Sequence, residues 1–203
     1  MNRTKSRAAV LVAGLLATLA LAAPATSSAA LPGGTVMTAD WDVRHSWVDY
    51  VTNPAWYLGL GQGTVTRSGG AASQSGYGRT AWRSPWTNYE YGTRFAAASD
   101  STSGGVRTVQ LTGGLRFVVS PHSIDVRLSD IRVVQDAGGN ESIVLDAYYD
   151  PISGSPVTEN DLDFADLVGD QPQLTSGGAT VFNGGSNGSY RAGDAFGALV
   201  YNP

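Results

Sequence analysis

Short segments that alternate apolar and polar residues recur along the chain, separated by glycine- or serine-rich stretches. They occupy residues 34–40, 63–69, 108–120, 123–136 and 142–150. A period near two predicts β-strands, and QDAGGN at 135–140 predicts a hairpin turn between the last two segments. This regular spacing favours a mainly β fold, an antiparallel sandwich or barrel-like sheet with one or two short helices.

Residues 41–51 depart from this pattern and predict a short helix. His45 and Asp49 fall on its polar side, and one apolar face collects Val43, Trp47, Tyr50 and Val51. We expect Asp40 to cap the start of this helix, and Asn53 followed by proline to end it.

Residues 174–184 predict a second short helix. Thr175 is a suitable N-cap, and Ala179 and Phe182 would be buried. Residues 159–169 remain ambiguous, because Leu162 and Phe164 suit a strand whereas Leu162 and Leu167 suit a helix.

Residues 1–30 have the pattern of a secretory signal peptide. Three positive charges precede an apolar run of roughly 16 residues, and Ser-Ala-Ala precedes an expected cleavage after Ala30. The run is shorter than the about 20 residues of a membrane-spanning helix. The sequence thus predicts one mature domain, residues 31–203, that is secreted or held outside the cell by a partner.

The expected mature domain is acidic and lacks both lysine and cysteine. It has ten arginines against 17 acidic residues, a net charge near −7. Nucleic acid and anionic membranes bind clustered positive charge, so neither is an expected partner. The missing cysteines exclude thiolate metal sites and cysteine nucleophiles, and two histidines argue against a multi-histidine zinc site.

No catalytic motif is recognisable, and we expect a binding protein and not an enzyme. The chain lacks a G-x-S-x-G elbow, a phosphate loop and a dinucleotide fingerprint. A pair of glycosidase carboxylates stays open, because their separation is not visible in sequence. DLDFAD at 161–166 has no EF-hand pattern and favours a solvated turn over a calcium loop. The aromatic residues of 76–95 favour packing of a sheet face, with sugar stacking as the alternative.

Three blocks resemble a known family. The first contains Trp41, Ser46, Trp47, Tyr50 and Val51; the second spans 112–133, and the third is LTSGGATVFNGGSNGSYRAGDAF at 174–196. In this order they are similar to the HtaA domain, a module of exported actinobacterial heme-uptake proteins. The similarity covers most of residues 36–203.

The resemblance implies ferric heme as the ligand and assigns residues to it. Tyr50 corresponds to the axial ligand, and Tyr190 to a tyrosine close to the pocket. The supporting histidine of the family aligns without gaps on Ser120, whereas His122 arrives two residues later. Two residues along a strand return to the same face of a sheet, which would let His122 reach the site.

The resulting prediction is a secreted heme-binding protein of iron acquisition or relay, with a membrane-attached heme-uptake protein as a possible recipient. The alternative is an extracellular β-sandwich module that binds cell-wall or carbohydrate partners and has lost heme ligation. Arg44, Arg79 and Arg116 are candidate partners for the heme propionates, and His45 is expected on the surface.

Overall fold

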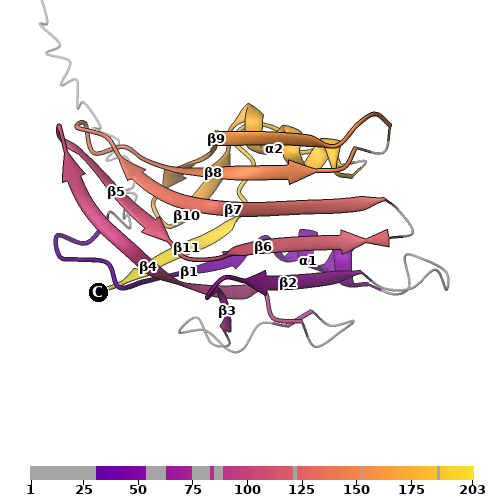
Figure 1. Cartoon of the computed structure of the whole chain (residues 1–203), viewed down its shortest axis with the longest axis horizontal. Coiled ribbons are helices and arrows are strands. Elements are labelled where there is room, and N and C mark those ends of the chain that lie inside the picture. The colour runs from indigo at the N-terminus through magenta and orange to yellow at the C-terminus, as the bar shows by residue number, and fades with distance from the viewer. Residues whose placement is uncertain are drawn as a thin grey trace, which may run out of the picture.

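Antiparallel strands and two short helices form the fold in the computed structural model, which describes residues 31–53, 63–74, 83–84, 89–120, 123–151, 153–186 and 188–203 (Figure 1). In chain order the elements are β1 (Thr38–Val43), α1 (His45–Thr52), β2 (Thr64–Ser68), β3 (Ala72–Gln74), β4 (Gly92–Ser103), β5 (Val106–Leu111), β6 (Gly114–Val119), β7 (Ile124–Gln135), β8 (Glu141–Tyr149), β9 (Val157–Val168), β10 (Gln171–Leu174), α2 (Ser176–Gly184) and β11 (Gly197–Asn202).

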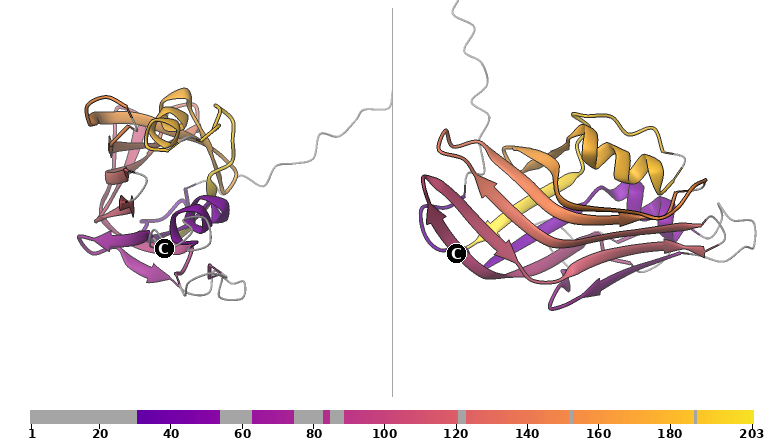
Figure 2. Two further views of the ribbon diagram at one scale, coloured as in Figure 1. Left: turned by 90° about the vertical axis from the view of Figure 1, so that its right-hand side faces the viewer. Right: turned by 45° about the horizontal axis from the view of Figure 1, so that its top comes forward.

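The strands form one antiparallel sheet that is nearly closed into a barrel. Its order is β10-β9-β8-β7-β5-β4-β1-β11, and β6 pairs with the first half of β7 and with β2. The last strand returns to β10, because Phe196 N–H donates to Pro172 O at 2.7 Å and Leu199 N–H donates to Asp170 O at 2.7 Å. Figure 2 shows the sheet curling around its interior with both helices packed along it. The prediction of a barrel-like antiparallel sheet with two short helices is confirmed.

The hairpin predicted at 135–140 is confirmed, and β8 shows why this region folds as strands. Gln135 pairs with Glu141 across the turn, and the Asp136 carboxylate accepts the backbone N–H groups of Gly138 and Asn140 at 2.8 and 2.9 Å. Burial alternates along the whole of β8. One face of the strand therefore packs in the core and the other lies towards the outside.

Of residues 159–169, left ambiguous by sequence, all but the last belong to β9, which pairs with β8 over its length. The solvated turn expected for DLDFAD at 161–166 is wrong for the same reason. Phe164 and Ala165 are fully buried there, while the carboxylates of this segment alternate towards the outside. Pairing with β8 decided the structure of this acidic stretch.

Helix α2 is confirmed with the predicted cap. The Thr175 hydroxyl accepts a hydrogen bond from Gly178 N–H at 3.1 Å, and Ala179 and Phe182 are buried. Gly178 also allows the helix to lie close to β9, because a Cβ there would stand 2.2 Å from Phe164 O. The helix and strand approach each other at a distance that only glycine permits.

The predicted start of α1 is wrong, although its end at Asn53 is confirmed. Asp40 and Val43 lie in β1, and the Asp40 carboxylate accepts two hydrogen bonds of 2.6 Å from Arg94 on β4. The helix begins at His45 after Arg44, whose side chain makes no capping hydrogen bond. Pairing of β1 with both β4 and β11 therefore outweighed the helical pattern of residues 41–43.

Asp125 on β7 provides a test of how ionic contacts support the sheet. Burial raises its pKa, but hydrogen bonds from Arg116 and Arg127 outweigh that effect and hold the pKa at about 2. A lowered carboxyl pKa stabilises the fold above the unfolded value of about 3.9, and this contribution is lost as pH falls towards 2. Both arginines are about half exposed, which screens the pairs. We expect Asp125→Asn to lower the free energy of unfolding by about 1 kcal/mol at pH 7.

Urea unfolding of both proteins between pH 7 and pH 2 checks this expectation. The difference between wild type and Asp125→Asn should shrink as pH falls from about 4 to 2, because the unfolded carboxyl gains its proton first and the native carboxylate only near pH 2. A difference that stays constant across this range would contradict the ionic origin of the effect.

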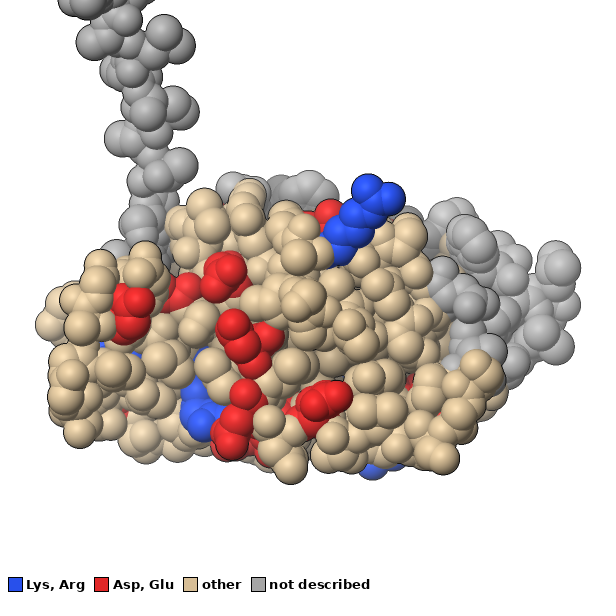
Figure 3. Space-filling model, turned by 90° about the horizontal axis from the view of Figure 1, so that it is seen from above, with Lys and Arg blue, Asp and Glu red and all other residues tan. Residues whose placement is uncertain are grey.

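The surface seen from above is mostly uncharged, with acidic side chains spread among the neutral ones (Figure 3). Within the described residues, neither helix has the length and hydropathy that crossing a membrane requires.

Candidate functional site

A cavity of about 490 Å³ lies between α1 and the segment that follows α2. Its volume falls within the roughly 300–1,000 Å³ of small-molecule sites. Two parts of the chain that are far apart in sequence supply its walls: Arg44, Ser46, Trp47 and Tyr50 from the first, and Ser186, Gly188, Ser189, Tyr190 and Asp194 from the second. The structure thereby brings Tyr50 and Tyr190, both predicted as site residues, to one cavity.

Helical spacing places Tyr50 at this cavity. Trp47 and Val51 are buried on the inner face of α1, and Tyr50 lies half-buried at the edge of that face. The rings of Trp47 and Tyr50 are 5.9 Å apart. Residues three apart are neighbours on a helix, so the Trp47 ring packs beside the Tyr50 ring.

Tyr190 is held by α2 although it lies beyond the end of that helix. The Asn183 side chain donates to Tyr190 O and accepts from Tyr190 N–H, both at 2.8 Å. The Tyr190 ring packs 5.6 Å from Phe182 and 6.2 Å from Trp47. A Cβ on Gly188 would come within 2.9 Å of this ring, so glycine leaves room for it.

The hydroxyl groups of Tyr50 and Tyr190 keep their protons at neutral pH when no ligand is bound. Burial raises the pKa of Tyr50. Burial also raises the pKa of Tyr190, and the positive charge of Arg44 only partly opposes that effect. The Arg44 guanidinium lies 5.2 Å from the centre of the Tyr190 ring and donates to Ala195 O at 3.2 Å. A ligand that needs a phenolate must therefore supply a positive charge itself.

The indole N–H of Trp47 is a buried hydrogen-bond donor without a partner among the described residues. This nitrogen is the one buried side-chain N or O atom in the described parts of the chain without a hydrogen-bond partner. A buried unpaired N–H is uncommon and costs stability.

Ser120 does not line the cavity. Ser120 is exposed at the end of β6, and His122 lies outside the described residues. The end of β6 nevertheless lies beside α1, because Gly63 N–H donates to Val51 O at 3.1 Å and a Cβ on Gly63 would meet Val119. The roles of Ser120 and His122 stay predictions.

Among the other candidates, Arg44 is at the cavity and Arg116 is not. Arg116 is engaged with Asp125 through two hydrogen bonds of 2.8 Å, and Arg79 lies outside the described residues. His45 is partly exposed; its ring stacks on Tyr91 at 3.9 Å and contacts the Asp42 carboxylate at 3.2 Å.

The aromatic segment 76–95 is described only in part. Tyr91 is buried, and its hydroxyl donates to Asp49 at 2.8 Å, which agrees with packing for this residue. Tyr77, Trp82 and Trp86 lie outside the described residues.

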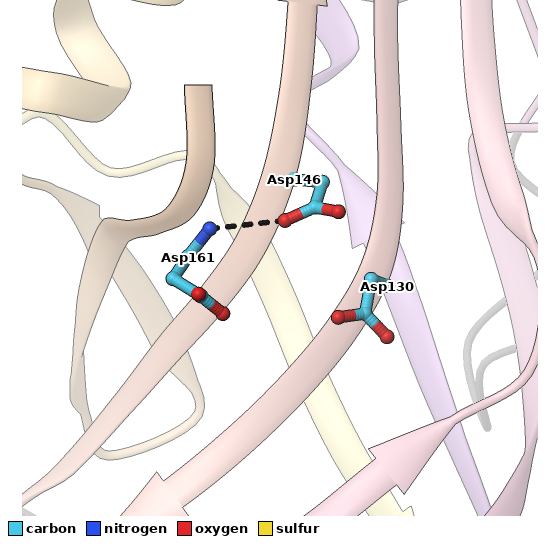
Figure 4. Close-up of side chains that lie close together, drawn as sticks. All are labelled: Asp130, Asp146 and Asp161. Atoms are coloured by element: carbon cyan, nitrogen blue, oxygen red, sulfur yellow. Dashed lines mark hydrogen bonds between the residues drawn. The ribbon is translucent and has the colours of Figure 1, made fainter. Parts of the chain in front are cut away.

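Three carboxylates also meet on the sheet surface, from Asp130, Asp146 and Asp161 (Figure 4). Their oxygens lie within 4.8 Å of one another. Arg132 forms ion pairs with Asp130 and Asp161, and Asp146 accepts the backbone N–H of Asp161 at 2.9 Å. Each of the three carboxylates therefore already has a partner from the protein.

Fold and site together define a nearly closed antiparallel β domain with an aromatic and polar pocket between α1 and the segment that follows α2. The family model Htaa matches residues 36–201, and the chain belongs to this HtaA family. No curated protein matches the chain.

Two solved structures share the fold. The N-terminal domain of HtaA from Corynebacterium glutamicum is 20% identical, with a TM-score of 0.57 over 82% of this chain and 95% of that domain. The C-terminal domain of the same protein is 14% identical, with a TM-score of 0.57 over 81% of this chain and 94% of that domain.

Proposed function

We propose that this chain is a secreted protein that binds ferric heme through Tyr50 and serves in heme acquisition or relay. Membership of the HtaA family supports a heme-related role. The observation that carries the proposal is that Tyr50 and Tyr190, 140 positions apart, line the same cavity of about 490 Å³. A residue that only filled the core would not open onto a pocket of ligand size.

The residues of the cavity fit a heme group chemically. Aromatic rings of Trp47 and Tyr190 suit the face of a macrocycle, and Arg44 with Ser46 offers donors to its carboxylates. Tyr50 provides a hard oxygen, which prefers iron(III). Of the arginines predicted as propionate partners, Arg44 lines the cavity and Arg116 does not.

Bound heme would supply the positive iron centre that both phenols lack. Since burial raises the pKa of Tyr50, the phenol alone keeps its proton at neutral pH. Coordination must therefore release that proton, either to solvent or to a base, which is the role predicted for His122. Heme is the cargo of this site, and hand-over to a membrane-attached heme-uptake protein completes the proposed role.

Titration with hemin tests the proposal directly. The protein should take up one equivalent and develop the visible charge-transfer bands and the iron–oxygen Raman mode of a ferric phenolate. If absorption only reports non-saturable partitioning of hemin, the proposal is wrong and the chain keeps the fold without the ligand.

His122→Ala and Ser120→Ala separate the two positions predicted for the supporting residue. We expect His122→Ala to weaken hemin binding by about 10–100-fold, as loss of a residue that supports an iron ligand does, and Ser120→Ala to leave it unchanged. The reverse result would move the supporting role to Ser120.

A further inference from the structure

Residues 31–36 form a segment that is buried at its two ends, and polar side chains of the barrel bind its backbone. Leu31 and Val36 are 6% and 1% exposed. Arg107 donates to Pro32 O at 2.6 Å and to Gly34 O at 2.7 Å. Val36 N–H donates to Asp100 at 2.8 Å. The sheet therefore binds this segment through its peptide groups.

The first contact of this segment is made by a buried carboxylate. Leu31 N–H donates to Glu141 Oε1 at 2.6 Å, across 110 residues of sequence. Glu141 is 7% exposed and also accepts hydrogen bonds from the Gln135 amide at 3.0 Å and the Tyr201 hydroxyl at 3.3 Å. All three donors are neutral, and none of the described residues forms a salt bridge with Glu141.

The charges around Leu31 do not balance. Asp100 and Glu141 bring two negative charges, whereas Arg107 brings one positive charge and forms its ion pair with Asp100 at 2.6 Å. The Glu141 charge acts on Arg107 as well, since it contributes to raising the pKa of that guanidinium. One buried negative charge remains without a cation of its own, an arrangement that proteins rarely keep.

The nitrogen that Glu141 binds belongs to the peptide bond between Ala30 and Leu31, the bond at which the sequence predicts signal cleavage. We propose that an exported endopeptidase cuts this bond and that Glu141 then binds the new α-ammonium group of Leu31. Water adds to the Ala30 carbonyl, the C–N bond breaks, and the Leu31 nitrogen takes up protons to become –NH₃⁺. Ala30 leaves as a carboxylate.

Cleavage supplies the cation that the Glu141 site lacks. The neutral N–H donor becomes a charged group with three donors, and hydrogen bonds between ionised partners are stronger than those between neutral ones. Because Leu31 is buried in the folded domain, the cut must come before this segment docks. Processing is thus coupled to completion of the barrel, independently of any ligand in the cavity.

The titratable and charged groups that face this site come from four strands. They are Asp100 on β4, Arg107 on β5, Glu141 on β8 and Tyr201 on β11. The carboxylate should raise the pKa of the α-amine above its ordinary value of about 8. The stabilisation is then complete below pH 8 and is lost as pH rises through the raised value.

The experiment uses the full chain, expressed with its leader in a secreting host, and the exported protein is purified. N-terminal sequencing should find Leu31 as the first residue; another first residue overturns the proposal. Residues 31–203 contain no lysine, so reductive methylation reports on the α-amine alone. At pH 7 we expect methylation to be at least about tenfold slower than that of the peptide Leu-Pro-Gly-Gly, which corresponds to one pKa unit or more.

Glu141→Gln keeps the shape of the side chain and removes its charge. In this variant we expect the methylation rate to return towards that of the peptide and the melting temperature to fall, with the fall disappearing at alkaline pH. Hemin uptake should be unchanged, which separates this proposal from that for Tyr50. If wild type is methylated as fast as the peptide, Glu141 does not hold the amine, whether or not the variant folds.

Discussion

Replacing Tyr50 with phenylalanine is expected to abolish ferric coordination and to weaken hemin binding by more than about 100-fold, beyond the loss seen for residues that only support a metal ligand. The substitution removes one oxygen atom and leaves the ring that packs 5.9 Å from Trp47. The fold should be intact, because Tyr50 is only half-buried and Trp47 and Val51 anchor α1. Loss of the phenolate charge-transfer bands in the hemin spectrum is the measurement.

Two matched variants identify the ligand. Tyr190→Phe removes the second phenol of the cavity and should weaken binding while preserving the phenolate bands. Tyr148→Phe alters a tyrosine that packs against Arg127 outside this cavity and should change nothing. Should Tyr50→Phe bind hemin with the wild-type spectrum and Tyr190→Phe lose the bands, the axial ligand is Tyr190.

The binding of hemin should also depend on pH with a defined sign. Burial raises the pKa of Tyr50, so the free protein holds a neutral phenol and coordination releases its proton. Affinity is therefore expected to rise with pH, by up to about tenfold per unit, until the phenol or a hemin hydroxide titrates. The Tyr50→Phe variant should lack this dependence.

Local signals in the sequence were sufficient for α2 and for the β7–β8 hairpin. Thr175 caps α2 with its own hydroxyl, and Asp136 closes the hairpin turn through neighbouring N–H groups. These interactions join residues a few positions apart, so propensity and turn chemistry describe them fully.

Interactions across the sheet explain why the sequence did not predict the start of α1 and the strand β4. Residues 41–43 can form a helix face, but they pair with β4 and β11, and Asp40 binds Arg94 54 residues away. The strand β4 went unpredicted because its second half, rich in serine, lacks apolar alternation and depends on β5 for pairing. A one-dimensional pattern does not contain these partners.

The candidate site was predicted in part through its two tyrosines, and only the fold explains why they meet. Sequence could not rank the three candidate arginines; the turn between β1 and α1 places Arg44 at the cavity. The small residues Ser186, Gly188 and Ser189 were missed as lining residues. The sequence GGSNGSY has the composition of an ordinary loop. The one feature that could have identified these residues is the glycine two positions before Tyr190, which leaves room for the tyrosine ring.

Phe182 joins the core to the cavity, and its replacement with alanine is the second large effect that we expect. Its ring is fully buried and stacks on Phe196 at 4.2 Å. It also packs 4.9 Å from Trp47 and 5.6 Å from Tyr190, the residues that support both sides of the cavity. Truncation of a buried phenylalanine costs about 3–5 kcal/mol through lost burial and the cavity that remains. Urea unfolding should show this loss.

A second buried phenylalanine distinguishes stability from site geometry. Phe95 on β4 is also fully buried, but it makes no ring contact with Trp47, Phe182 or Tyr190. We expect Phe95→Ala to lose a similar 3–5 kcal/mol or so and to keep the hemin affinity of its folded fraction. Phe182→Ala should lose hemin affinity as well, because Trp47 and Tyr190 then relax into the vacated space. Equal hemin affinity in the folded fractions of the two variants would mean that the cavity does not depend on the aromatic packing beneath it.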